Sequence, residues 1–200
     1  SEIHPVLVHS DSRLRSAEAF ELNFVAQLKP LEIRHYKIIS YIHQDAPEKT
    51  VDIQVLNANT DFSSIFRNTF TIASSKDADV LKLSNEYFSV SFSSNGTAKS
   101  IQRKDTGENR LFKISFKYYK SGKRSGLYSF FPEGSAEPLN FKNPVITIVR
   151  GTFKSYVEVW LPNVKHRLTL YNHKGLCNHM FVTCYSIWLF RSTFVYKYVS

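Results

Sequence analysis

Apolar and polar residues alternate along much of this chain with a period of two, which predicts β-strands. Every second residue from 20 to 26 is apolar, so this stretch is predicted as a half-buried strand. A second strand, rich in Ile and Tyr, is predicted over 33–42. Between 44 and 79 the only extended runs are short, at 51–56 and 66–73, and a boundary near 60–80 is expected.

The clearest alternation begins at residue 80. Phe88, Val90 and Phe92 share one face, and Asn95-Gly96 follows, a pair typical of β-hairpin turns. Further strands are predicted at 112–118, 145–149, 153–161 and 167–171, with turns at 105–107 and 150–152. No segment has the 3.6-residue period of a long amphipathic helix. The pattern therefore predicts an all-β fold.

The stretch 124–138 combines an aromatic run with two glycines and two prolines. Residues 127–131 are predicted as a strand that ends at Pro132, because proline offers no ladder N–H group. Glu133-Gly134-Ser135 supplies a turn in which Gly134 is free to take a positive φ, and Pro138 restarts the chain in extended form.

Composition and charge change this picture little. With 200 residues and 42% hydrophobic content, the chain is long enough to bury a core. A net charge of +9 allows an anionic partner, but the cations are spread along the chain. Basic and aromatic residues interleave over 112–124, as they do in single-strand nucleic-acid platforms. These residues are Phe112, Lys113, Phe116, Lys117, Tyr118, Tyr119, Lys120, Lys123 and Arg124. A solvated strand face over a buried aromatic face is the favoured alternative, so no nucleic-acid partner is expected.

Candidate catalytic and metal-binding residues form no recognisable constellation. Glu133 and Glu137 flank a turn that does not fix their separation for paired acid/base chemistry. Histidines and cysteines cluster near the end of the chain, but their spacing matches no zinc pattern. They are His166, His173, Cys177, His179 and Cys184. We therefore assign no catalytic, cofactor-binding or metal residue.

Asn95-Gly96-Thr97 has the pattern of an N-glycosylation acceptor. Hairpin geometry explains Asn-Gly equally well without a sugar. Asn95 is therefore a possible glycosylation site, with a purely structural role as the alternative.

Residues 125–138, SGLYSFFPEGSAEP, resemble the S-G-A-Y-L-F-L-P-[DN]-G-x-A-x-P stretch of the α-mannosidases of glycoside hydrolase family 38, closest to the Golgi α-mannosidase II branch. Residues 83–96 resemble that family's L-x-N-x-x-x-x-V-x-F-x-x-x-G hairpin. Residues 148–157 resemble its V-T-x-G-x-x-x-S-x-V segment, and 166–171 its H-R-x-R-L-Y strand. The resemblance covers about 18–174, although Glu32 stands where the family usually has glycine.

The resemblance implies a domain plan. Residues 1–60 would end a small β-sandwich, 61–79 would hold a linker and short strands, and 80–175 would begin a large antiparallel β-supersandwich of the galactose mutarotase-like kind, here truncated. Residues 176–200 depart from the family as an apolar tail without acids, which holds both cysteines and the only methionine. We hypothesise that this tail is foreign to the domain. A membrane-seeking segment is the alternative, but Arg191 and Lys197 interrupt it before spanning length, and no membrane span is expected.

The resemblance also implies a function for a parent protein. Family members hydrolyse α-mannosidic bonds with retention, here in N-glycan processing, using an aspartate nucleophile, a carboxylic acid/base and a zinc ion in an N-terminal α/β domain. None of that domain is in this sequence, so we expect an inactive fragment that binds no zinc itself. Its expected partners are the catalytic α/β domain and mannose-containing N-glycans, and its expected location is the Golgi lumen, although this sequence shows no targeting signal.

The alternative is a stand-alone β-sandwich module that binds carbohydrate or an anionic partner. If the chain is a mannosidase fragment, we expect an in-frame catalytic domain to be encoded upstream of Ser1. If it is a stand-alone module, we expect a start codon there. Apolar sheet edges would favour aggregation of the isolated chain.

Overall fold

The computed structural model describes residues 2–10, 13–39, 51–61, 70–75, 81–126, 128–162, 164–173, 180–186 and 194–199. Within these ranges every regular element is a β-strand, which confirms the all-β prediction. The strands are β1 Glu2–Ser10, β2 Arg13–Asn23, β3 Asp52–Leu56, β4 Asn59–Asp61, β5 Thr71–Ser75, β6 Lys82–Ser84, β7 Phe88–Phe92, β8 Ala98–Arg103, β9 Asn109–Leu111, β10 Lys113–Tyr118, β11 Glu137–Pro138, β12 Val145–Arg150, β13 Lys154–Leu161, β14 Val164–Tyr171, β15 Met180–Ser186 and β16 Phe194–Val199.

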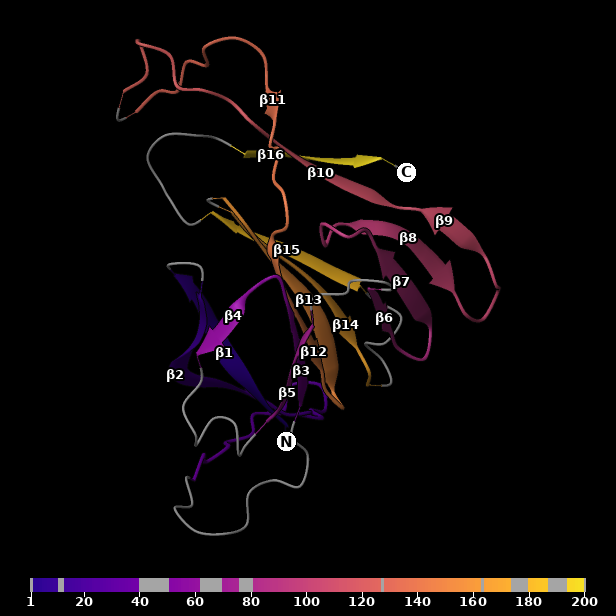
Figure 1. Cartoon of the computed structure of the whole chain (residues 1–200). Helices are drawn as coiled ribbons and strands as arrows, with labels where there is room; N and C mark the ends of the chain where they lie inside the picture. Colours follow the sequence, from indigo (N-terminus) through magenta and orange to yellow (C-terminus); the bar gives the residue numbers. More distant parts are fainter. Residues whose placement is uncertain are drawn as a thin grey trace.

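A six-stranded sheet in the order β15-β14-β13-β12-β3-β5 forms the middle of the described structure. Its strands pair antiparallel except for β3 and β5, which are parallel. In Figure 1 the sheet β1-β2-β4 lies on one side of it and the sheet β6-β7-β8-β9 on the other. Seven of the eight residues of β13 are buried, as expected of a strand covered on both faces.

Among the described residues, two hydrophobic cores fill the spaces between these sheets. Ile146, Ile148 and Val157 belong to the core shared with β6, β7, β8 and β10, whereas Val149 and Tyr156 belong to the core shared with β1 and β2. Neighbouring residues of β12 and β13 thus point into different cores, because side chains alternate across a strand. The central sheet therefore positions everything that lies on its two faces.

The hairpin predicted around Asn95-Gly96 is confirmed. β7 and β8 pair antiparallel, and the Gly96 amide donates to the Ser93 carbonyl at 2.8 Å. Gly96 has a φ of 76°, and a Cβ there would lie 2.6 Å from Cγ2 of Val159. The turn therefore needs glycine both for its backbone conformation and for its packing on the central sheet.

The predictions near the N-terminus are partly wrong. β2 includes 20–23, but residues 24–39 form no strand, and 40–42 lie outside the described residues. Ile33 and Ile38 are 86% and 76% exposed, so the apolar pattern of 33–39 has no neighbouring strand among the described residues. Strand β1 was not predicted at all.

Residues beyond 179 also enter the sheets. β15 pairs with β14, and Met180, Val182 and Cys184 pack against the core of the central sheet. β16 pairs with β10. The foreign origin of the tail, the domain boundaries and the supersandwich detail stay predictions. Among the described residues, no helix is long and apolar enough to cross a bilayer.

Candidate functional site

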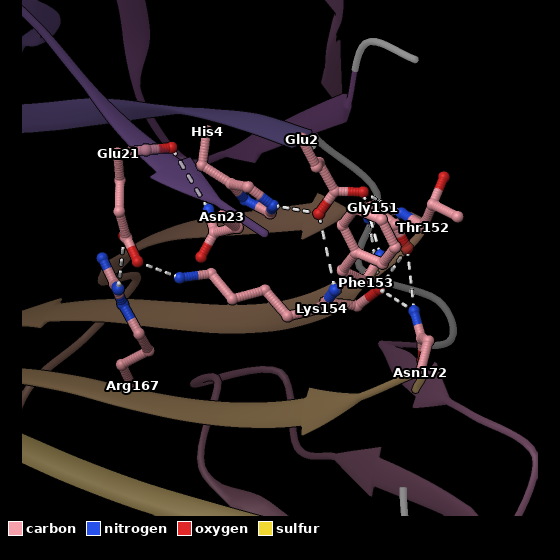
Figure 2. A network of polar contacts seen from close by, with 11 residues as sticks. Glu2, His4, Glu21, Asn23, Gly151, Thr152, Phe153, Lys154, Arg167 and Asn172 are labelled. Atoms are coloured by element: carbon pink, nitrogen blue, oxygen red, sulfur yellow. Dashed lines mark hydrogen bonds and ion pairs between the residues drawn. The ribbon is translucent and has the colours of Figure 1, made fainter. Parts of the chain in front are cut away.

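Charged side chains gather where the central sheet meets β1 and β2 (Figure 2). Lys154 and Glu158 lie on the same face of β13, on either side of Tyr156, and both are buried, at 6% and 2% exposure. Opposite them, His4 of β1 and Glu21 of β2 are register partners. Because successive side chains of a strand point to opposite faces, these polar residues of the two sheets face each other across a shared interface.

Glu2 is the most enclosed acid of this interface, with 1% of its side chain exposed. Its carboxylate accepts hydrogen bonds from the Thr152 amide, from the Phe153 amide at 3.0 Å and from the Lys154 amide at 3.4 Å. His4 Nε2 contacts its Oε1. Burial opposes ionisation of Glu2, but the hydrogen bonds from His4 and from the backbone outweigh it, so the pKa lies below its usual value.

Glu21 joins the two sheets by ion pairs. Lys154 Nζ donates to its Oε1, and Arg167 Nη1 lies 3.8 Å from its Oε2. Burial opposes ionisation of this carboxyl group too, but Lys154 and then Arg167 hold its pKa below the usual value. The Asn23 side chain donates to the Glu21 carbonyl at 3.2 Å, which fixes the end of β2.

Arg167 completes the network on the central sheet. Its Nε and Nη2 donate to Glu158 Oε2 at 2.7 and 2.6 Å, and Lys165 Nζ lies 3.6 Å from the same oxygen. The guanidinium carbon lies 4.2 Å from the centroid of the Tyr156 ring, which also stacks on His4. Burial raises the pKa of Tyr156 well above its usual value, so its hydroxyl stays protonated.

Charge is balanced across this interface. The acids are Glu2, Glu21 and Glu158, and the cations are Lys154, Lys165 and Arg167. Removing one member of a buried ion pair leaves an uncompensated charge, which costs about 3–5 kcal/mol. The carboxylates are engaged by cations and backbone amides, so the arrangement acts by holding the two sheets in one relative position.

The signature stretch 125–138 lies elsewhere, in the loop between β10 and β11 that extends away from the sheets (Figure 1). The strand predicted over 127–131 is wrong for 128–131, and Leu127 lies outside the described residues. The Ser125 hydroxyl instead donates to the Phe131 carbonyl and accepts from the Phe131 amide, both at 2.9 Å. The Phe131 carbonyl also accepts from the Gly122 amide at 2.8 Å, and Ser121 and Pro132 form an antiparallel bridge, so side-chain and backbone contacts together close the loop.

The end of the loop follows the prediction. Gly134 has a φ of 86°, and the chain becomes extended again at β11. Glu133 is exposed, whereas Glu137 accepts from the Tyr118 hydroxyl at 2.9 Å and from Lys120 Nζ at 2.8 Å. These contacts tie Glu137 to β10 and do not pair it with Glu133.

The basic and aromatic residues in and next to β10 lie on two different faces, as predicted for a solvated strand face over a buried aromatic face. Lys113 and Lys117 are exposed, whereas Phe116 is buried and Phe112 half-buried. The expectation that no nucleic acid binds here stays a prediction.

Asn95 has a structural role in the hairpin turn. Its Oδ1 accepts from the Thr97 hydroxyl at 2.8 Å and from the Thr97 amide at 3.2 Å. The side chain is partly exposed. Glycosylation at this residue stays a prediction.

Among the histidines and cysteines, His166 and Cys184 meet across β14 and β15, with Nδ1 3.1 Å from Sγ. Burial lowers the pKa of His166 to about 4, which keeps its ring neutral near pH 7. Cys177 and His179 lie outside the described residues. The described part of the chain contains no group of three His, Cys, Asp or Glu side chains that could hold a metal ion. The zinc ion of the parent enzyme stays a prediction.

Sequence reasoning missed the charged interface because it missed β1. The signal that could have found it is the spacing of Glu2 and His4, two polar residues on the inward face of an otherwise apolar segment. Their partners are about 150 residues away in the sequence, so no local pattern connects them.

The residues that carried the resemblance have structural roles. Asn85 Oδ1 accepts from the Tyr87 and Phe88 amides at 3.0 and 2.7 Å, and its Nδ2 donates to the Tyr171 carbonyl at 2.8 Å. Gly151 lies so close to Glu2 that a Cβ would come within 2.4 Å of Oε1. The motifs therefore mark turns and sheet contacts.

The described fold is all-β, and the acids of this interface pair with cations and backbone amides of the same chain. Residues 83–178 match the Glycosyl hydrolases family 38 C-terminal domain. Alpha-mannosidase 2 of Rattus norvegicus is 28% identical over 179 residues, which are 88% of this chain and 15% of that protein. Alpha-mannosidase 2 of Drosophila melanogaster is 37% identical over 83 residues, 39% of this chain and 7% of that protein.

The family's C-terminal domain thus matches just under half of the chain, and the chain is similar to alpha-mannosidase 2 over most of its length. It spans about 15% of the length of the Rattus norvegicus relative.

Proposed function

We propose that this chain is the non-catalytic C-terminal β-structured part of an α-mannosidase that hydrolyses α-mannosidic bonds during N-glycan processing in the Golgi lumen. The match of residues 83–178 to the family's C-terminal domain carries this proposal. The geometry supports it, because the buried acids of the described structure are committed to ion pairs and backbone amides.

In this proposal the chain supplies a scaffold to the parent enzyme. The catalytic α/β domain packs against it and holds the zinc ion, and mannose-containing N-glycans are bound by the assembled enzyme. Exposed apolar residues between 20 and 39 are suited to such packing, since burying apolar area is the main favourable term in association. They include Phe24, Leu28, Leu31 and Ile33.

One observation favours a second candidate, a stand-alone module that binds carbohydrate. The loop between β10 and β11 exposes Tyr128, Phe130 and Phe131, at 96%, 40% and 46%. Exposed aromatic rings offer an apolar body with, for tyrosine, a polar end, which suits amphipathic ligands such as sugar rings.

Sequencing the gene upstream of the Ser1 codon separates the two candidates. An in-frame region encoding a family 38 catalytic domain is the result expected for the scaffold function. A start codon with no coding sequence before it would overturn that function and favour the stand-alone module.

A further inference from the structure

In the turn between β12 and β13, successive backbone N–H groups point at the same carboxylate. The amides of Thr152, Phe153 and Lys154 all donate to the two oxygens of Glu2. Converging N–H groups of this kind form an anion-binding concavity, as in many phosphate sites. Here the anion is supplied by β1 of the same chain, from the sheet that faces the turn (Figure 2).

The turn is shaped for a carboxylate by groups that do not belong to Glu2. Asn172 Nδ2 donates to the Gly151 carbonyl at 2.8 Å, and the Asn172 amide donates to the Phe153 carbonyl at 2.7 Å. The Ser155 hydroxyl accepts from the Gly151 amide at 3.2 Å. Asn172, which follows β14, and Ser155 of β13 thus hold the turn, which leaves its amides directed at the acid.

Gly151 provides the room for the anion. A Cβ at this position would lie 2.4 Å from Oε1 and 2.6 Å from Cδ of Glu2, closer than any side chain tolerates. Its φ is not in the left-handed region, so the close approach of the carboxylate, and not backbone conformation, is what requires glycine here.

We propose that the turn 151–153, with the Lys154 amide, is a carboxylate-binding site whose resident ligand is Glu2, and that this contact fastens the β1-β2 sheet to the central sheet. His4, stacked on Tyr156 and in contact with Oε1, closes the site on the β1 side. The charged groups nearby are Glu21 on β2, Lys154 on β13 and Arg167 on β14, and these pair with one another. The site accepts a free carboxylate once the Glu2 side chain is removed.

The test uses the full chain with Glu2→Ala, and Glu133→Ala in the exposed loop as the matched control. Hydrogen exchange at the amides of Thr152, Phe153 and Lys154 is measured by mass spectrometry, with formate as the added ligand. We expect faster exchange at these amides and in β1 for Glu2→Ala alone, and renewed protection by formate. Formamide and sodium chloride at the same concentration should protect much less.

Two further measurements test the same contact, and the first of them keeps the proposal falsifiable if Glu2→Ala does not fold. In the wild-type chain, the amide proton shifts of Thr152 and Phe153 should titrate together with the Glu2 carboxyl group. Gly151→Ala should lower the unfolding midpoint strongly in the wild-type background and much less beside Glu2→Ala, because the clash is then gone. Equal protection by formamide or chloride, amide shifts that do not follow Glu2, or additive effects of the two substitutions would each overturn the proposal.

Discussion

At the scale of single residues, three glycines at turns differ in why they are required. Gly96 combines a φ of 76° with contact to Val159, whereas Gly107 has a φ of 70° and open space around its Cβ position. Gly151 has neither a left-handed φ nor open space at its Cβ position, and it is required only because the Glu2 carboxylate lies so close. Glycine is thus required at these turns for three different reasons, namely backbone strain, packing and a bound anion.

Substitution of Gly96 by Ala is expected to destabilise the chain by about 2–5 kcal/mol. The left-handed backbone contributes about 1–2 kcal/mol and overpacking against Val159 about 1–3 kcal/mol. Gly107→Ala is the control, which shares only the first contribution. Urea unfolding of both variants measures the difference, and equal losses would contradict the packing role of Gly96.

Two carboxyl groups of the sheet interface predict how stability depends on pH. The pKa values of Glu2 and Glu21 are both lower in the folded chain than the usual value of 4.5. The unfolded chain therefore binds more protons in acid, and the stability from these groups, complete above about pH 4.5, is lost as the pH falls through the lowered pKa values. Melting temperatures measured downward from pH 5 should fall less for Glu2→Gln than for the wild type. Parallel curves would contradict the role of Glu2.

At the scale of elements, much of the strand pattern could be predicted from the sequence. The alternation over 112–118 placed Ile114 and Phe116 inside and Lys113 and Lys117 outside, as the structure has them. Such faces are set by neighbouring residues alone, because successive side chains of a strand point in opposite directions.

Where a segment depends on a distant partner, the sequence was a poor guide. The apolar residues of 33–39 have the composition of a strand but no paired neighbour among the described residues. The loop before Phe131 is closed by the Ser125 hydroxyl and the Gly122 amide, and residues 128–131 form no strand. The charged interface depends on contacts such as that between Glu2 and the Phe153 amide. These residues are 151 positions apart in the sequence, so no local pattern predicts the contact.

Asn85 joins the hairpin sheet to β14, and its removal tests that connection. Asn85 is 7% exposed, and Asn85→Ala removes the side chain that bonds two amides and the Tyr171 carbonyl. We expect the free energy of unfolding to fall by about 2–3 kcal/mol. Asn109→Ala on the exposed strand β9 should change stability by less than about 0.5 kcal/mol. Thermal unfolding compares the two, and an Asn85→Ala loss no larger than that of Asn109→Ala would refute the connection.

At the scale of the whole molecule, apolar surface outside the two cores bears on solubility. Leu31 is fully exposed and Ile33 86% exposed, within a run of exposed apolar side chains. Large exposed apolar patches mark interaction sites or aggregation liabilities. We therefore predict that the chain alone is poorly soluble, as expected for a region that packs against the remainder of a larger enzyme.

Replacing Leu31 and Ile33 by Lys should raise the soluble fraction and suppress light scattering. Lys at the exposed Ser94 and Ser129 adds the same charge without removing apolar surface, and should help much less. A wild-type chain that is monomeric and melts cooperatively would contradict the prediction.

The central claim is that this chain provides structure and not catalysis, and an activity measurement tests it most directly. The purified chain is incubated with an aryl α-mannoside and zinc, beside an intact α-mannosidase as the positive control. The account predicts no hydrolysis above the buffer blank. Turnover that requires zinc and is lost on Glu21→Gln or Glu158→Gln would contradict it, because it would make the acids of the sheet interface catalytic groups.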